Sequence, residues 1–220
     1  MSRNIKITPG EFYHVYNRGV DKRKIFQSDS DYGRFLALLY LGNSTFAVDL
    51  KLQGRTFEEV ARIERKETLV DICAYCFMPN HFHLLLHEKT EGGVSHFMQK
   101  IATAYTMYFN KKNERSGVLF QGKFKAEHVD KDTYLKYLLS YIHLNPVKII
   151  EPDWKESGIT DRKRAELFLN SYQYSSYPDF LKQDRIEKEI INKNILPEYF
   201  ETIDDFKDMM RDWLEFKNML

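Results

Sequence analysis

Cysteine is scarce in this chain of 220 residues, which contains only Cys73 and Cys76, so a scaffold of several disulfide bonds is excluded. Long apolar segments are also missing, because none approaches the roughly 18 residues that a membrane-spanning helix needs. Residues 1–10 lack the apolar stretch of a signal peptide. These absences favour a cytoplasmic protein without a membrane partner.

Net charge is small as well, +1 at pH 7, but its distribution along the chain is uneven. Residues 1–27 carry six Lys or Arg against two Asp or Glu, and residues 96–150 carry nine against four. Residues 183–220 reverse the balance, with six basic and ten acidic side chains. The basic segments favour a polyanionic partner, although a solvated surface explains the same charges.

Apolar periodicity indicates the fold class. Strands are predicted at 12–18, 69–77 and 81–87, with an extended or strand segment at 119–125. Helices are predicted at 29–41, 94–113 and 132–144, and a capping box at Thr56 predicts a short polar helix to about Lys66. This order favours an α+β fold: a ferredoxin-like antiparallel sheet with helices packed on it, plus a C-terminal helical extension.

The most informative segment is residues 78–86, Met-Pro-Asn-His-Phe-His-Leu-Leu-Leu. Because side chains alternate along a strand, His81 and His83 share one face while Phe82 lies on the other. Two adjacent imidazoles on an apolar strand can serve as a pair of metal ligands. A hairpin with two half-exposed histidines accounts for the same pattern.

A second informative element is the predicted helix that contains Tyr141 and Asn145. Their spacing of four residues places them on one helix face, one turn apart. Tyr134 and Tyr137 lie on overlapping stripes of the same helix. Since a helical tyrosine is commonly a core residue, the case for Tyr141 comes from its combination with the histidine pair and the basic segments.

Residues 78–85 resemble the HUH motif of the single-tyrosine HUH transposases (transposase IS200-like), in particular the REP-associated tyrosine transposases. Further stretches similar to that branch are found at residues 12–19, 117–125, 141–148 and 174–177. The resemblance covers roughly residues 10–178. The segments 42–68 and 154–169, and the acidic tail after Asp184, are particular to this chain.

The resemblance implies a site-specific transposase that nicks and joins single-stranded DNA, often beside a hairpin, so the implied partner is hairpin-containing single-stranded DNA. His81 and His83 match the HUH metal ligands, Asn145 matches the polar residue that completes the metal site, and the implied cofactor is Mg²⁺ or Mn²⁺. Tyr141 matches the nucleophile that forms a 5′-phosphotyrosine, with Tyr134 as the next candidate. Residues 1–150 would form the catalytic domain and residues 151–220 an accessory segment, in a monomer or a homodimer.

The basic side chains near the motifs are candidate DNA contacts: Arg18, Lys22, Arg23, Lys24, Lys123 and Lys125. Stacking of DNA bases on Tyr105, Tyr108 or Phe120 is less favoured than core packing of these aromatics. The remaining histidines, among them His14, are interpreted as structural or surface residues.

A zinc site built from Cys73 and Cys76 is not favoured, because an offset of three along a regular strand puts the two thiols on opposite faces. Two other functions stay open. One is a nucleic-acid-binding regulator that keeps the fold without turnover, and the other is a metallonuclease that uses water as its nucleophile. The second is less favoured, since few carboxylates lie near the motifs.

Overall fold

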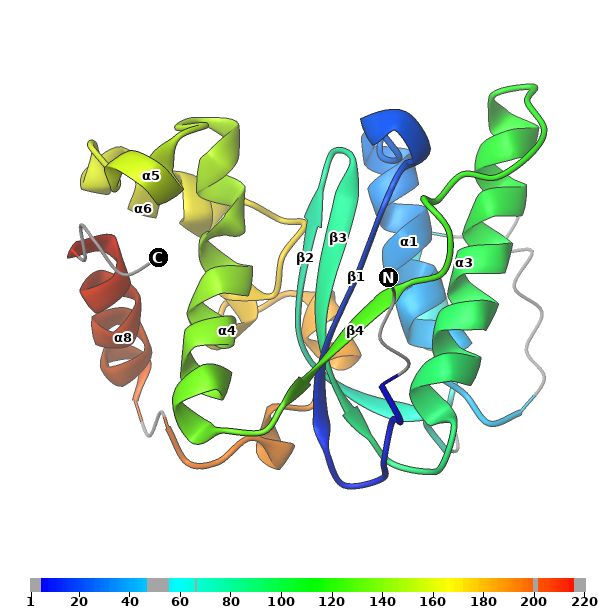
Figure 1. Ribbon diagram of the computed structural model, residues 1–220, viewed down its shortest axis with the longest axis horizontal. Helices are drawn as coiled ribbons and strands as arrows, with labels where there is room; N and C mark the ends of the chain where they lie inside the picture. The colour runs from blue at the N-terminus through cyan, green and yellow to red at the C-terminus, as the bar shows by residue number, and fades with distance from the viewer. Residues whose placement is uncertain (1–4, 47–55, 66, 200–201, 216–220) are drawn as a thin grey trace.

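A four-stranded antiparallel sheet with the strand order β2-β3-β1-β4 forms the centre of the molecule (Figure 1). Its strands are β1 (Phe12–Arg18), β2 (Val70–Met78), β3 (His81–Glu88) and β4 (Lys125–Val129). The computed structural model describes residues 5–46, 56–65, 67–199 and 202–215. With α1 (Asp29–Gly42) joining β1 to β2 and α3 (Gly93–Lys112) joining β3 to β4, the predicted ferredoxin-like arrangement is confirmed.

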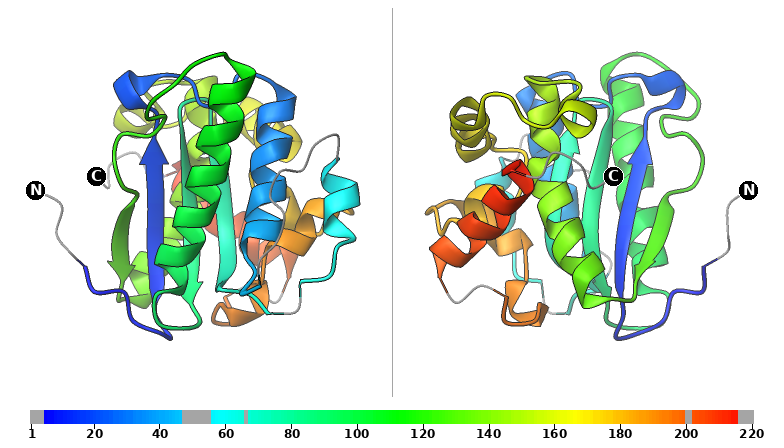
Figure 2. Two further views of the ribbon diagram at one scale, coloured as in Figure 1. Left: turned by 90° about the vertical axis from the view of Figure 1, so that its right-hand side faces the viewer. Right: turned by 60° about the vertical axis from the view of Figure 1, so that its left-hand side comes forward.

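The two faces of this sheet pack against different helices, because side chains alternate along each strand. Phe82, Leu84 and Leu86 are buried in the core that α1 and α3 cover. Leu85, on the opposite face, belongs to a second core with α4 (Asp132–Leu144). Figure 2 shows α1 and α3 over one face and α4 over the other. The histidine pair of β3 therefore faces α4, the helix that carries Tyr141.

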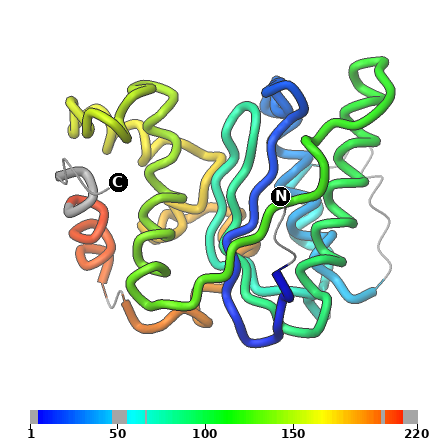
Figure 3. The backbone as a smooth tube through the Cα atoms, viewed as in Figure 1, coloured from blue at the N-terminus to red at the C-terminus, as the bar shows by residue number. Residues whose placement is uncertain are grey.

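The chain after α4 forms helices, most of which pack on the second core, whereas Ile190 is buried in the first core. The helices are η2 (Asn145–Ile149), α5 (Trp154–Ser157), α6 (Arg162–Ser171), α7 (Tyr177–Phe180), η3 (Ile186–Ile190), η4 (Lys193–Ile195) and α8 (Ile203–Glu215). Figure 3 follows this part of the chain from α4 back to β2. There the backbone N–H of Phe77 donates to Tyr174 O at 2.9 Å, and that of Ser176 donates to Tyr75 O at 2.9 Å. The predicted helical extension is confirmed.

Two local predictions need correction. The fourth strand begins at Lys125, whereas residues 119–124 form a loop. This loop contacts the end of β1 through single hydrogen bonds, such as that from Gln121 N–H to Arg18 O at 2.8 Å, and through a bridge between Gly19 and Phe120. Gly122 in that loop has φ of +80°, which breaks extended geometry. The helix capped by Thr56 is α2 (Phe57–Ala61) and ends before Lys66. Residues 47–55 and 66 of the segment 42–68 lie outside the described residues.

The prediction that Cys73 and Cys76 point to opposite faces is wrong. A β-bulge between Ile72 and Ala74 adds one residue to β2 at Cys73 and changes the side-chain alternation there. Both thiols are free and lie buried in the core on the α4 side. Among the residues that the structure describes, no helix combines the length and the apolar character needed to cross a bilayer.

Candidate active site

His81 and His83 lie at the start of β3, with ring centroids 5.0 Å apart. The strand begins directly after the Pro79-Asn80 turn, so both rings are held at one end of the sheet. Burial is the largest cause that lowers the pKa of His81 to about 4, followed by the nearby charges of Lys155 and Lys148. Burial also holds the pKa of His83 well below its usual value. Both imidazoles are therefore neutral at pH 7, the form that binds metal ions.

The hydrogen bond of His81 selects one tautomer of its ring. Its Nδ1 atom lies 2.6 Å from Oδ1 of Asn80. Since an amide oxygen only accepts, Nδ1 carries the proton and Nε2 keeps a free lone pair. Metal-binding histidines commonly hold their second ring nitrogen in this way.

His83 is held by His14, which the sequence predicts to be a structural or surface histidine. Nε2 of His14, on β1, lies 2.9 Å from Nδ1 of His83, and the two rings stack with centroids 5.1 Å apart. On its other side, Nδ1 of His14 lies 3.7 Å from Oε2 of Glu127 on β4. The adjacent ring of His14 is the main cause that lowers the pKa of Glu127 to about 2, so this carboxylate is ionised. An ionised Glu127 favours the proton on Nδ1 of His14, which leaves Nε2 of His14 to accept from His83 and frees Nε2 of His83.

Tyr141 reaches this cluster from α4. Its ring lies edge-on to His83, with centroids 5.3 Å apart, and 6.1 Å from the ring of His14. Lys155, on α5, donates a hydrogen bond to the phenol oxygen at 3.0 Å, and its Nζ lies 4.1 Å from the ring centroid. An ammonium at the phenol oxygen stabilises negative charge there, which suits a nucleophile.

The other tyrosines of α4 have different partners. Tyr134 donates its hydroxyl proton to Glu127 at 3.2 Å. Burial, reinforced by Glu127, raises the pKa of Tyr134 to about 12. Tyr137 stacks between Tyr134 and Tyr141, with ring centroids 6.0 Å from each, and burial raises its pKa. The oxygen of Tyr141 accepts from a cation, whereas the hydroxyl of Tyr134 donates to a carboxylate, which favours Tyr141 over the alternative Tyr134.

Asn145 caps the end of α4 and is 1% exposed. Its side chain acts on His81 by raising the pKa of that ring, against the larger effect of burial, while its own Nδ2 atom is buried without a partner. Buried polar atoms are rarely left unpaired. Rotation of the Asn145 amide by 180° would put its oxygen, which can bind a metal ion, in the place of the unpaired nitrogen. Within the described residues no cluster of three His, Cys, Asp or Glu side chains could hold a metal ion. A metal at this site would therefore depend on the two imidazoles and an amide oxygen, and these residues fit that donor set.

The predicted DNA contacts fall into two groups. Arg18 pairs with His81 across β1 and β3 and is a further cation that lowers the pKa of His81. Lys123, in the loop before β4, and Lys125, the first residue of β4, are both exposed, and Nζ of Lys125 lies 5.8 Å from the ring centroid of Tyr16. Lys22, Arg23 and Lys24 follow β1 in the loop that packs on the Pro79-Asn80 turn. The aromatics Tyr105 and Phe120 are buried in the core.

Comparisons with known proteins bear on the family and the fold of this chain. Residues 47–145 match the model of the family described as "Transposase IS200 like". The structure is similar to a solved REP-associated tyrosine transposase bound to a REP hairpin, with a TM-score of 0.54 and 13% sequence identity, over 85% of this chain and 90% of that chain. No curated protein matches the sequence significantly. The family predicted from the motifs is confirmed over the matched segment, and the structural likeness confirms the fold.

Proposed function

Residues 47–145 form an IS200-like transposase segment, and on this premise we propose that the protein cleaves and rejoins single-stranded DNA with Tyr141 as its nucleophile. The phenol oxygen of Tyr141 attacks the scissile phosphorus, and the bond from phosphorus to the 3′ oxygen breaks. The products are a 5′-phosphotyrosine and a DNA strand that takes up a proton as a free 3′-OH. Because the phosphodiester energy is kept in the covalent link, a second 3′-OH can reverse the step and join strands without ATP. The observation that supports this proposal best is the contact between Tyr141 and His83, whose ring centroids lie 5.3 Å apart.

We assign His81, His83 and Asn145 as the residues that would hold a divalent cation, Mg²⁺ or Mn²⁺. When bound, such a cation polarises the scissile phosphate and stabilises negative charge on its oxygens. His14 and Glu127 fix the ring orientation and tautomer of His83, and Asn80 does the same for His81. Lys155 stabilises the phenolate of Tyr141 as its proton leaves.

The substrate we propose is single-stranded DNA that contains a hairpin, by analogy with the similar transposase that is bound to a REP hairpin. The positive surroundings of His81, to which Lys155, Lys148 and Arg18 contribute, suit a phosphate group. A binding regulator without turnover is less consistent with this site, because a DNA-binding surface alone does not require a tyrosine held by a lysine beside two neutral imidazoles.

The direct test is a denaturing gel with labelled hairpin DNA taken from the flanks of the gene. With Mn²⁺ or Mg²⁺ we expect a labelled band that migrates with the protein, and EDTA should remove it. Cleaved DNA without protein attached would instead indicate hydrolysis by water. Binding without cleavage on any flank would support the regulator.

Removal of the Lys155 ammonium should slow the attack without preventing it. In Lys155→Met we expect the rate of adduct formation to fall by about tenfold or more, since a hydrogen bond to a charged group is worth ~1.5–3 kcal/mol. Single-turnover kinetics at saturating DNA would measure this, with Lys163→Met on the exposed side of α6 as a control of equal charge change. An unchanged rate would show that Lys155 does not act on the phenol oxygen.

A further inference from the structure

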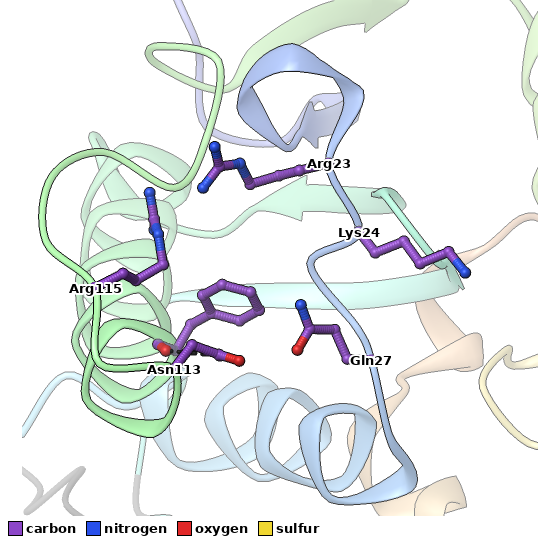
Figure 4. A pocket seen from close by; sticks show the side chains of 6 residues that line it. Arg23, Lys24, Gln27, Asn113 and Arg115 are labelled. Atoms are coloured by element: carbon purple, nitrogen blue, oxygen red, sulfur yellow. Dashed lines mark hydrogen bonds between the residues drawn. The ribbon is translucent and has the colours of Figure 1, made fainter.

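A small cavity lies outside the candidate active site, between the loop that follows β1 and the end of α3. Its volume is about 250 Å³, and it is lined by Arg23, Lys24, Gln27, Phe109, Asn113 and Arg115 (Figure 4). Phe109 is 2% exposed and forms an apolar wall, while the other lining side chains are polar or basic. Residues 22–24 were candidate DNA contacts from charge alone, whereas Arg115 is separated from them by more than 90 residues and is added by the fold.

The cavity gathers three cations without a carboxylate in its lining. Figure 4 shows the guanidiniums of Arg23 and Arg115 pointing toward one another from opposite sides. Like charges that face each other across a small space repel, so this arrangement gains stability when an anion lies between them. A phosphodiester has two charged oxygens that match guanidinium geometry, so it can accept from both arginines at once.

The two arginines differ in how the protein holds them. The guanidinium of Arg115 is fixed by hydrogen bonds to Oδ1 of Asn110 and, at 3.0 Å, to the backbone oxygen of Val118. In contrast, Nε of Arg23 is buried without a hydrogen-bond partner. An unpaired buried donor of a charged group is costly, and an anion that accepts from Arg23 would remove this cost.

The same loop is bonded to the turn that precedes the histidine pair. The backbone N–H groups of Ile25 and Phe26 donate to Pro79 O at 2.8 and 3.0 Å, and Nδ2 of Asn80 donates to Lys22 O at 3.3 Å. Oδ1 of Asn80 in turn holds His81. The cavity and the candidate active site thus lie at the same end of the sheet, joined through one two-residue turn (Figure 1).

We propose that this cavity binds one phosphodiester of the DNA strand, held between Arg23 and Arg115, while a neighbouring part of the strand occupies the Tyr141 site. This inference rests on the proposed function, because it takes DNA as the substrate. It adds a fixed point on the opposite face of the sheet, which sets the path of the strand over the turn and therefore which phosphodiester reaches Tyr141.

The test is the binding of fluorescently labelled hairpin DNA with single-stranded flanks, measured by anisotropy in EDTA over a range of salt concentrations. We expect Arg23→Ala to bind about tenfold more weakly, as for the loss of a charge-assisted hydrogen bond. The slope of log K against log salt should become shallower by about 0.7, the value for one lost phosphate contact on a single strand. Arg23→Lys should recover most of the slope, and Lys163→Ala, exposed on α6, should change neither quantity. Thermal unfolding followed by circular dichroism would confirm that the variants are folded.

The outcomes separate the two proposals. If the wild-type protein binds no hairpin DNA, both the proposed function and this inference fail. If the wild type binds and Arg23→Ala matches it in affinity and salt slope, the inference alone is wrong. Calorimetric titration with inorganic phosphate adds a third arm. If Arg23→Ala loses phosphate binding but binds DNA as the wild type does, the cavity is a site for free anions, and this result would also overturn the inference.

Discussion

Tyr141→Phe is expected to abolish the covalent protein–DNA adduct while leaving DNA affinity nearly unchanged. The substitution removes only the phenol oxygen, the atom that would bond to phosphorus and that accepts from Lys155. The ring, which lies edge-on to His83, is kept, so the packing of α4 on the sheet should not change. A denaturing gel measures the adduct, and fluorescence anisotropy on the same DNA measures binding.

Tyr134→Phe is the matched control for this prediction. Its hydroxyl donates to Glu127 and its pKa is raised to about 12, so it is poorly suited to attack. This variant should still form the adduct. A labelled adduct that persists in Tyr141→Phe and disappears in Tyr134→Phe would transfer the nucleophile to Tyr134.

The second large effect is expected at His14, which we do not place among the metal ligands. His14→Ala removes the partner of Nδ1 of His83, so the ring of His83 loses both its orientation and its preferred tautomer. Loss of such an outer partner typically weakens metal binding by about 10–100-fold. Titration of Mn²⁺ followed by electron paramagnetic resonance would measure this affinity in the absence of DNA.

The controls for His14 use two other side chains. His96→Ala changes an exposed histidine of α3 and should leave Mn²⁺ affinity as in the wild type. Glu127→Gln keeps the shape of the side chain but removes its charge, so it should weaken Mn²⁺ binding less than His14→Ala. Equal affinity in wild type and His14→Ala would refute the role of His14, whereas a wild type that binds no Mn²⁺ would refute the metal site itself.

Local patterns were sufficient to predict the elements that carry the histidines and the tyrosine. The helix with Tyr141 was predicted at 132–144, as α4 is observed, because its apolar spacing is regular and Pro146 follows it. The hairpin of β2 and β3 followed from two apolar runs separated by a short link. The position of β4 could not be predicted as well, since its five residues are mostly exposed and have no apolar alternation.

The residues that support the site depend on contacts between distant parts of the chain. His14 and His83 are 69 residues apart and do not pair directly, because His14 lies opposite Leu85 and His83 lies opposite Tyr16. Their contact is diagonal and follows from the register of β1 on β3. Lys155 lies on α5 and reaches Tyr141 because η2 turns the chain back toward the end of α4. The similarity of residues 12–19 to the REP-associated branch is the signal in the sequence that could have pointed to His14.

The bulge at Cys73 shows a different limit. Side-chain alternation predicts faces only while a strand stays regular, and one inserted residue reverses the prediction for everything on one side of it. Nothing in the composition of Ile72-Cys73-Ala74 marks the insertion. The positions of His81 and His83 were unaffected, because they lie on β3, beyond the irregularity.

The pairing of residues 174–176 with β2 also bears on how two copies of this protein could associate. A sheet exposes unpaired N–H and C=O groups at each of its two outer strands, and these edges can join with the edge of another molecule. Here the chain itself occupies part of the β2 edge, through Tyr174, Ser176 and the N–H of Asn192, which donates to Ile72 O at 2.8 Å. The opposite edge is β4, a strand of five residues with Lys125, Glu127 and His128 exposed. Short, charged edges of this kind disfavour strand pairing, so a dimer of this protein would be built through helices and side chains rather than through one continuous sheet.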